Sequence, residues 1–346
     1  SVPEHPILSA VIISIGYIMG ISAWNFAFAA NISLTNLLAK TQKDRNIYNS
    51  QRMMGSNLGR LMGNYLTPVI VAFLRPMLRE RASYPVLVLV AGIFYIATEQ
   101  LHFKLANGAE ETYTAHEYNV NDSEDSLNFK EIFKSLSTNS QLLVTVLIDL
   151  SSNMAALALP SLAVYYYKYV FEAPQMVSVH MLAIGLAGFA GSTFVRLFGK
   201  NVKSYRNYLL CIYLVISLFL ICTKFASKNI YAFLALNVLI HALTGTTQPF
   251  EMNLYQDNVI YSEWKTGVNA NSLIMGLGEL PVRIASILKG LLLSFALASA
   301  GYAAGAQPTE ALKNALANAY AFIPACIPVI GFILLKFAYK LTPEKI

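Results

Sequence analysis

Long apolar runs alternate with short polar stretches along most of the chain. A helix that crosses a bilayer needs about 20 consecutive, mostly apolar residues, and nine segments meet this condition. They are roughly 7–38, 53–74, 84–101, 141–171, 176–198, 207–225, 230–254, 271–300 and 315–340. The pattern therefore predicts an all-α membrane protein.

Composition supports this prediction. Only 13% of the 346 residues are charged, whereas 55% are hydrophobic. A soluble domain has about 25% charged residues, so this chain has too few to cover a water-facing surface. We expect an integral, multi-pass protein whose exterior contacts the lipid bilayer. The formal net charge of +6 fits basic cytoplasmic connections, and the lack of a basic patch interleaved with aromatic residues argues against nucleic acid as a partner.

The sequence also argues against an enzyme. The three cysteines lie in apolar segments without metal-ligand or disulfide spacing, and no nucleophile–base pair or glycine-rich phosphate loop is present. The glycines of "GLAGFAG" at 185–191 are spaced within a predicted span, which favours close helix packing. We predict no metal site, no cofactor and no catalytic residue, and we expect His180 and His241 to be packed helix residues.

Two polar connections interrupt the predicted spans. Residues 102–140 are too polar to cross a bilayer and are expected to form a cytoplasmic linker, with a short amphipathic helix near 129–136. Three spans precede this linker and six follow it, whereas a transporter of two equivalent halves has equal numbers. We therefore expect three further helices before residue 1 in the natural protein. The second connection is predicted at 257–267, "DNVIYSEWKTG".

The distribution of Lys and Arg predicts which connections are cytoplasmic. Residues 40–52, the linker, 199–206, 257–267 and the C-terminus can all lie on one side of the membrane. That side then carries about twice as many Lys and Arg as the opposite connections. These regions are therefore predicted to face the cytoplasm.

Charges within predicted spans are candidate functional residues, because a charge in the bilayer costs a few kcal/mol. Arg52 opens the second span, where it can instead reach lipid phosphate. Glu279 and Arg283 lie four residues apart in the favourable order for an ion pair, which can be structural or functional. Asp149 is a candidate coupling residue or a helix-end acid, and the deeper Asn153 is a candidate contact to a polar solute.

The connection at 257–267 carries the most specific motif. "QDNVIYSEWKTGVNANSLI" resembles the link between the tenth and eleventh helices of the glycoside–pentoside–hexuronide:cation symporters, a melibiose-carrier-like group of the major facilitator superfamily. "KDRNIYNSQRMMGSNLG" at 43–59 resembles that group's link between the fourth and fifth helices. Ile260 and Asn269 depart from the pattern, since the group often has Asp and Arg there. The matching residues are Asp257, Tyr261, Glu263, Thr266 and Gly267, with Asp44, Arg45 and Arg52 in the second stretch.

This resemblance covers nearly the whole chain and implies a helical bundle like those of the major facilitator superfamily, with about nine of twelve helices present. Residues 1–101 would be the remainder of the N-terminal bundle, helices four to six, and 141–346 the C-terminal six-helix bundle. The implied function is transport of a glycoside or related sugar with Na+ or H+ by alternating access. The implied setting is a monomer in the bacterial cytoplasmic membrane.

The resemblance also implies residue roles. Arg52 matches a position that contributes to the group's sugar site, and Arg283 falls where the group has a Lys near its cation and sugar sites. The cytoplasmic connections are expected to hold an inner gate through weak ion pairs, which suit a two-state equilibrium. The predicted gate residues are Asp44, Arg45, Glu251, Asp257, Tyr261, Glu263 and Lys265.

One expected feature is missing. The segment 7–38 should carry an acidic residue that binds sugar and cation, but it contains no Asp or Glu, and either Gly20 or Phe28 stands in its place. Trp24 can still stack on a sugar ring, and Asn25 beside it is a second candidate contact. A non-transporting relative and a carrier of a lipid or other amphiphile therefore remain alternatives. A sugar substrate predicts a cavity lined by Arg52, Asn153 and Arg283, whereas a lipid predicts an apolar cavity open to the bilayer.

Overall fold

The structure is a computed structural model that describes residues 6–39, 41–74, 80–106, 139–267, 270–302 and 309–341. These residues form helices, and no strand occurs among them. The first helix group consists of α1 (Pro6–Leu38), α2 (Gln42–Leu74) and α3 (Glu80–Ala106). The second helix group consists of α6 (Ser140–Tyr169), α7 (Met176–Phe198), α8 (Tyr205–Cys222), α9 (Ile230–Thr266), α10 (Asn271–Gly276), α11 (Leu280–Ser299) and α12 (Glu310–Ile333). Short helical turns, η1 (Gly199–Asn201), η2 (Leu277–Glu279) and η3 (Leu334–Ala338), follow α7, α10 and α12.

Eight of the described helical segments are long and apolar enough to cross a membrane by length and composition. The ninth predicted span lies within α2, which is a continuous helix of 33 residues but is not among the eight. Its first half carries polar side chains such as Asn46, Asn49 and Asn57, and these contact the second helix group rather than lipid. Elsewhere the exterior is apolar, as the 79% and 70% exposed fractions of Phe26 and Phe94 illustrate.

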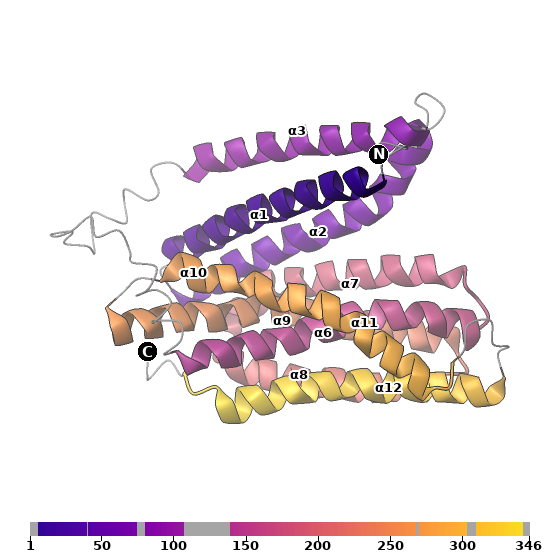
Figure 1. Cartoon of the computed structure of the whole chain (residues 1–346). Helices are drawn as coiled ribbons and strands as arrows, with labels where there is room; N and C mark the ends of the chain where they lie inside the picture. The colour runs from indigo at the N-terminus through magenta and orange to yellow at the C-terminus, as the bar shows by residue number, and fades with distance from the viewer. Residues whose placement is uncertain are drawn as a thin grey trace.

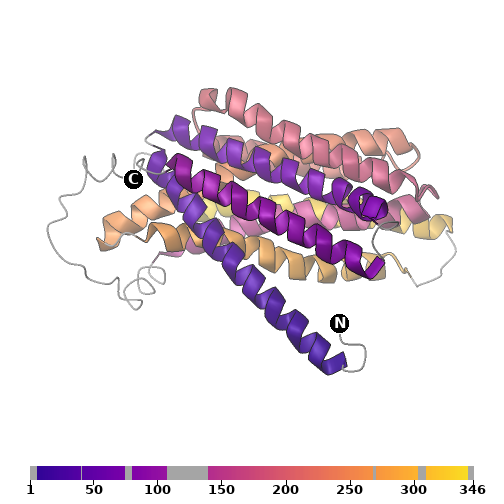
Figure 2. The same cartoon turned by 90° about the horizontal axis from the view of Figure 1, so that it is seen from above.

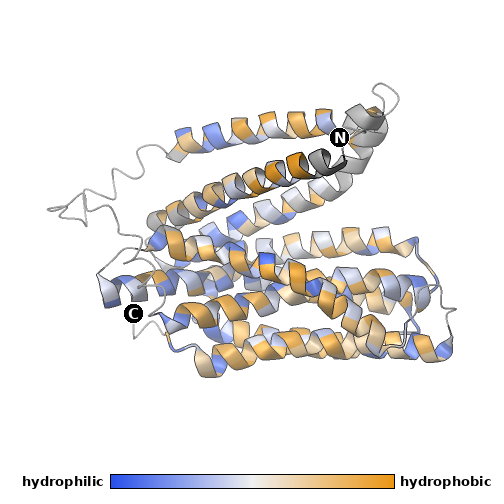
Figure 3. Cartoon of the chain, in the orientation of Figure 1, coloured by the Kyte–Doolittle hydropathy of each residue, from blue (hydrophilic) through white to orange (hydrophobic). Residues whose placement is uncertain are grey.

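The two helix groups lie side by side along most of their length (Figure 1). They approach each other most closely at the end where α1 stops, α2 starts and α9 passes into α10. From there α1 runs obliquely away from the other helices in the second view (Figure 2). The hydropathy colouring shows mostly apolar residues along the helices of the second group (Figure 3). The aromatic core of that group is built from Tyr166, Tyr167, Phe233 and Tyr320, all nearly inaccessible to solvent.

The predicted glycine packing is confirmed between α7 and α9. A Cβ atom added to Gly191 would collide with the backbone carbonyl of Ala242, and one added to Gly245 would collide with that of Gly188. These glycines let two helix backbones touch, as small residues do in membrane bundles. On its other side, α7 packs along α2.

The prediction of a connection at 257–267 is wrong. Residues 257–266 are the last turns of α9, and the helix ends only at Gly267. Gly267 adopts a left-handed φ of +70°, and its N–H donates to the carbonyl of Glu263 at 2.8 Å, a common helix ending. The polar residues do not mark a loop, because the second and third turns from this end of α9 are buried against neighbouring helices.

Among the regions predicted to share the cytoplasmic side, contacts between described residues place parts of 40–52, 199–206, 257–267 and the C-terminal segment at one end of the molecule. Arg45 of α2 pairs with Asp257 of α9, and Arg206 of α8 donates to the carbonyls of Leu335 and Lys336. The backbone N–H of Lys340 donates to the side chain of Gln141 at 2.6 Å. The amphipathic helix predicted near 129–136 lies outside the described residues. So does Asn269, one of the two positions that differ from the symporter pattern.

Candidate central cavity and inner gate

A cavity of about 920 Å³ lies between the two helix groups. Its walls come from α1, α2 and α3 on one side and from α6, α9, η2 and α11 on the other. The polar residues that line it are Trp24, Arg52, Ser56, Tyr95, Thr98, Glu99, Asp149, Asn153, Gln248, Glu251, Glu279 and Arg283. The cavity therefore brings together residues that are more than 200 positions apart in the sequence. Among them are Arg52, Asn153 and Arg283, the three residues predicted to line a cavity for a sugar substrate.

Two arginines line this cavity, one from each helix group. The guanidinium of Arg52 lies 5.3 Å from the centre of the Phe28 ring, within the range of a cation–π contact. Arg283 pairs with Glu279 at 3.3 Å, so the predicted ion pair is confirmed. The tight turn η2 ends at Glu279 and α11 restarts at Leu280 with Pro281 in its first turn, where the missing proline N–H breaks no helical bond.

Two buried carboxylates form the floor of the cavity in the second helix group. Asp149 accepts hydrogen bonds from Asn153 at 2.7 Å and from the hydroxyl of Tyr255 at 3.0 Å. Glu251 accepts one from the hydroxyl of Tyr213 at 2.7 Å. The exposed fractions of Asp149 and Glu251 are 7% and 2%. The side chains that donate these hydrogen bonds are neutral. Glu251 was predicted to belong to the gate, but the structure places it in the cavity wall.

A further carboxylate, Glu99, enters the cavity from α3 and was not among the predicted site residues. Glu99 also lines a recess of about 200 Å³ together with Trp24, Asn31, Arg52 and Tyr95. The rings of Trp24 and Tyr95 lie 6.4 Å apart. The sequence did contain a signal for this residue, because Glu99 falls within the predicted span 84–101, where any charge is a functional candidate.

Trp24 and Asn25 are separated by the geometry of α1. Trp24 lines both the cavity and the recess, whereas Asn25 is exposed and does not belong to the lining of either. Successive helix residues point about 100° apart, and on this turn of α1 the side chain of Trp24 is the one directed toward the cavity. The structure therefore supports Trp24 alone as a candidate sugar contact on this turn.

The cavity is closed at one end by contacts between the two helix groups, which we call the inner gate. Asp257 is 4% exposed, and its carboxylate accepts hydrogen bonds from the hydroxyls of Tyr205 and Tyr339. Arg45 lies 3.8 Å away across the gate. Burial beside this carboxylate raises the pKa of Tyr339 well above its usual range, so its hydroxyl keeps the proton that it donates. Asp257 is thus held by its own helix group and bridged to the other.

Neutral amides make up most of the polar part of the inner gate. Asn49 of α2 donates to Asn253 of α9 at 2.9 Å, and Asn253 donates to Asn46 at 2.6 Å. Asn46 in turn donates to the carbonyl of Gly199 at 3.2 Å. These side chains are almost fully buried, so each bond that breaks exposes a polar group that must find water. Sequence reasoning missed this network because isolated asparagines give no distinctive motif.

An apolar contact supports the amide network. Ile32, near the end of α1, is fully buried and packs in one cluster with Ile274 and Met275 of α10. The Cβ of Ala29 would lie 3.2 Å from a Cβ added to Gly276, so the backbones of α1 and α10 run close together. The inner gate therefore combines burial of apolar side chains with a small number of polar bonds.

The remaining predicted gate residues lie at the periphery of this end. Asp44 accepts hydrogen bonds from the backbone N–H and the hydroxyl of Thr41 at 3.1 and 2.8 Å, which fixes the start of α2. Lys265 lies over the ring of Tyr261 at 5.7 Å. Tyr261, Glu263 and Lys265 occupy the last turns of α9, where Trp264 is 76% exposed and suits the membrane interface.

Replacing Asn253 with alanine is expected to open the inner gate more often. The change removes two buried hydrogen bonds between the helix groups, each contributing about 1 kcal/mol, and should raise the open population about tenfold or more. A cysteine placed at the fully buried Ser50 in a cysteine-free background reports this opening through its labelling by an impermeant maleimide. The exposed Asn207 provides the matched control, Asn207→Ala, and equal labelling rates in both variants would contradict the proposed gate.

These features define a class of protein: a multi-pass helical membrane protein with two helix groups around a charged cavity and a closed inner end. A family model described as MFS/sugar transport protein matches residues 2–343. The chain therefore belongs to this family of the major facilitator superfamily, and the predicted family and all-α membrane fold are confirmed.

Individual relatives are distant in sequence. The chain is 26% identical over 218 residues to YagG of Escherichia coli (strain K12), named as a glycoside/cation symporter, covering 62% of this chain and 46% of that protein. It is 22% identical to the lactose permease of Lactobacillus delbrueckii subsp. bulgaricus, covering 99% of this chain and 54% of the permease. It is 20% identical to the isoprimeverose transporter of Lactiplantibacillus pentosus, covering 90% and 63%. The chain thus spans about half to two thirds of the length of these relatives.

Proposed function

We propose that this chain provides the central binding site and inner gate of a secondary transporter that carries a glycoside or related sugar with Na+ or H+. The observation that carries the proposal is the charge pattern of the central cavity, in which Arg52 and Arg283 from opposite helix groups share the space with acidic side chains. Arginine forks and carboxylates form directional, charge-assisted hydrogen bonds with hydroxyl groups. The names of the relatives support the same substrate class.

The alternative of a lipid substrate is less well supported by this cavity. A lipid tail gains nothing from a wall of arginines, carboxylates and amides, because these groups would lose water without gaining hydrogen bonds. A sugar offers hydroxyls to both kinds of charged group. Trp24 and Tyr95 add aromatic faces that can cover the apolar side of a pyranose ring.

The arrangement of the helix groups supports alternating access. The described hydrogen bonds and the ion pair between α2 and the second group run from Arg45 to Asn57, which covers the inner half of α2. Transport requires that these bonds break in one state and form in the other. A gate of a few bonds worth about 1 kcal/mol each fits such an equilibrium, since a gap of a few kcal/mol separates the two states.

Asp149 and Glu251 are the proposed coupling site. Two buried carboxylates whose hydrogen-bond donors among the described residues are neutral carry a large desolvation penalty as anions. Binding one Na+ or H+ between α6 and α9 relieves this penalty. Their position beside Asn153 and Glu279 in the cavity links the ion to the solute.

Replacing Asp149 with asparagine is therefore expected to uncouple transport. The amide keeps the size of the side chain but has no charge to balance, so a cation gradient should no longer drive accumulation. Exchange of labelled for unlabelled solute across the membrane, which needs no net ion movement, should be retained to within about tenfold. If gradient-driven accumulation by Asp149→Asn equals that of the unaltered protein, Asp149 is not the coupling residue.

The proposed function is tested by uptake of labelled glycosides into liposomes that contain the full-length protein. A set of methyl hexosides and pentosides is compared with and without an inward Na+ gradient, and again with an inward H+ gradient. Concentrative uptake that collapses on addition of the matching ionophore is the expected result. A protein that is folded and correctly inserted but takes up no glycoside under either gradient would contradict the proposal.

A further inference from the structure

A second chamber of about 670 Å³ adjoins the central cavity and is lined by α2, α6, α7 and α9. Leu157 and Gln248 line both spaces, so the two meet at these side chains. The volume falls within the range of small-molecule sites. The role of this chamber is not explained by the charged residues of the central cavity.

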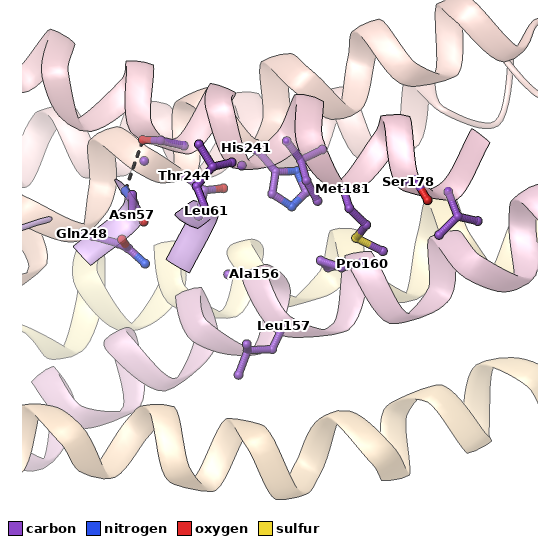
Figure 4. Close-up of a pocket in the computed structure, with 15 residues that line it drawn as sticks. Asn57, Leu61, Ala156, Leu157, Pro160, Ser178, Met181, His241, Thr244 and Gln248 are labelled. Carbon is purple, nitrogen blue, oxygen red and sulfur yellow. Dashed lines mark hydrogen bonds between the residues drawn. The ribbon is translucent and has the colours of Figure 1, made fainter. Parts of the chain in front are cut away.

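The wall of the second chamber is mainly apolar. The apolar residues that line it are Leu61, Ala156, Leu157, Pro160, Val177, Met181 and Ile184, together with three glycines. Figure 4 shows Leu61, Met181, Pro160 and Leu157 around the open space, with Ala156 on the α6 side. A wall of this kind favours an apolar occupant, because burying apolar surface is favourable whereas burying unpaired hydroxyls is not.

Most polar groups of the wall already have partners. Thr244 donates to the carbonyl of Ile240 at 2.9 Å, and Asn57 donates to the carbonyl of Gly188 at 3.3 Å, the bond drawn in Figure 4. His241 is different. Its Nδ1 lies 3.0 Å from the carbonyl of Asn237, which can only accept, so the neutral ring carries its proton on Nδ1.

The other ring nitrogen of His241, Nε2, is therefore a hydrogen-bond acceptor. It is buried and has no hydrogen-bond partner among the described residues. In Figure 4 the ring points from α9 toward the space above Ala156 and Leu157. A buried acceptor without a partner is uncommon in folded proteins, and a donor on a bound molecule would satisfy it.

We propose that the second chamber holds the aglycone of a glycoside whose sugar ring lies in the central cavity, and that His241 Nε2 accepts a hydrogen bond from a hydroxyl on that aglycone. This inference rests on the proposed function. The favoured substrate class is a glycoside of a phenol or similar flat, mostly apolar alcohol with one free hydroxyl. A second sugar fits less well, because the wall is mainly apolar and most of a sugar's hydroxyls would face apolar side chains.

The test is competition against uptake of a labelled methyl glycoside by the full-length protein in liposomes. The competitors are the methyl, phenyl and 4-hydroxyphenyl glycosides of one sugar and a disaccharide that begins with the same sugar. The phenyl glycoside is expected to compete better than the methyl glycoside, and the 4-hydroxyphenyl glycoside about tenfold better again, the contribution of one hydrogen bond to a buried acceptor.

Two substitutions separate the parts of this inference. His241→Phe keeps a ring but removes the acceptor, so it should abolish the advantage of 4-hydroxyphenyl over phenyl while methyl glycoside uptake persists. Ala156→Phe fills the chamber and should weaken both aryl glycosides about tenfold or more without affecting the methyl glycoside. Ala235→Phe, at an exposed position on α9, is the matched control and should change none of these values.

The outcomes are distinguishable. If methyl glycoside is taken up but the aryl glycosides compete no better, or if the disaccharide competes best, the inference is wrong and the proposed function stands. The same holds if Ala156→Phe has no effect on aryl glycosides, or if His241→Phe retains the tenfold preference. If no glycoside is taken up at all, the proposed function and the inference fail together.

Discussion

Replacing Arg283 with alanine is expected to abolish glycoside uptake while the protein remains folded and inserted in the membrane. Arg283 provides one of the two guanidinium groups of the central cavity and is paired there with Glu279. A charge-assisted hydrogen bond contributes about 1.5–3 kcal/mol, so the loss of two such bonds to a sugar should lower uptake by about 100-fold or more. Initial uptake rates in liposomes, normalised to the amount of inserted protein, measure the effect.

A double substitution shows whether Arg283 acts on the solute or only on Glu279. If Arg283 merely neutralises Glu279, the variant Glu279→Gln/Arg283→Ala removes both charges and should recover uptake. If Arg283 binds the solute, the double variant should remain inactive, which is the result we expect. Arg196→Ala, at an exposed position in the last turn of α7, is the matched control and should transport normally. Substantial uptake by Arg283→Ala would remove this residue from the site.

The spans could be predicted from the sequence because lipid imposes a simple length rule on apolar helices. The runs at 7–38, 141–171 and 176–198 agree with α1, α6 and α7 to within two residues at each end. The rule fails for α2, whose true start at Gln42 lies 11 positions before the predicted 53. The polar first turns of α2 pack against the second helix group, so they are shielded from lipid without being apolar.

The same physical reason explains the error at the end of α9. Asp257 and the residues after it were predicted to form a loop, because charges and amides rarely continue a span. In the folded chain this segment is buried by α2, by α8 and by Tyr339, which follows η3. The hydroxyls of Tyr205 and Tyr339 donate hydrogen bonds to Asp257. Hydropathy measures the preference for lipid, and it cannot report polar groups that find their partners in another part of the protein.

The candidate site was predicted best where a single rule applied. Intramembrane charge identified Arg52, Asp149 and the pair Glu279–Arg283, all of which line the central cavity. The same rule applies to Glu99, which lies within the predicted span 84–101. An acidic residue that is missing from one helix can be replaced by one on a neighbouring helix, and only the packing of α3 beside α1 reveals that Glu99 reaches the same space.

Replacing Glu99 with glutamine is expected to weaken glycoside binding by about 10- to 100-fold. Glu99 is the acidic residue that the first helix group contributes to the described cavity lining, where it faces the recess that also contains Arg52 and Trp24. A carboxylate can accept hydrogen bonds from two adjacent sugar hydroxyls, and an amide of the same size forms weaker bonds without charge assistance. The loss should raise the KM for uptake and leave exchange at saturating glycoside much less affected.

Binding itself can be followed through Trp24, whose indole lines the same recess. In a Trp264→Phe background, the change of tryptophan fluorescence on addition of methyl glycoside should require about 10- to 100-fold more ligand in Glu99→Gln. Glu310→Gln, in the first turn of α12 and away from the cavity, is the matched control and should leave the titration unchanged. Because the recess lies in the first helix group, an unaltered titration in Glu99→Gln would mean that this group recognises the sugar through Arg52 and Trp24 alone.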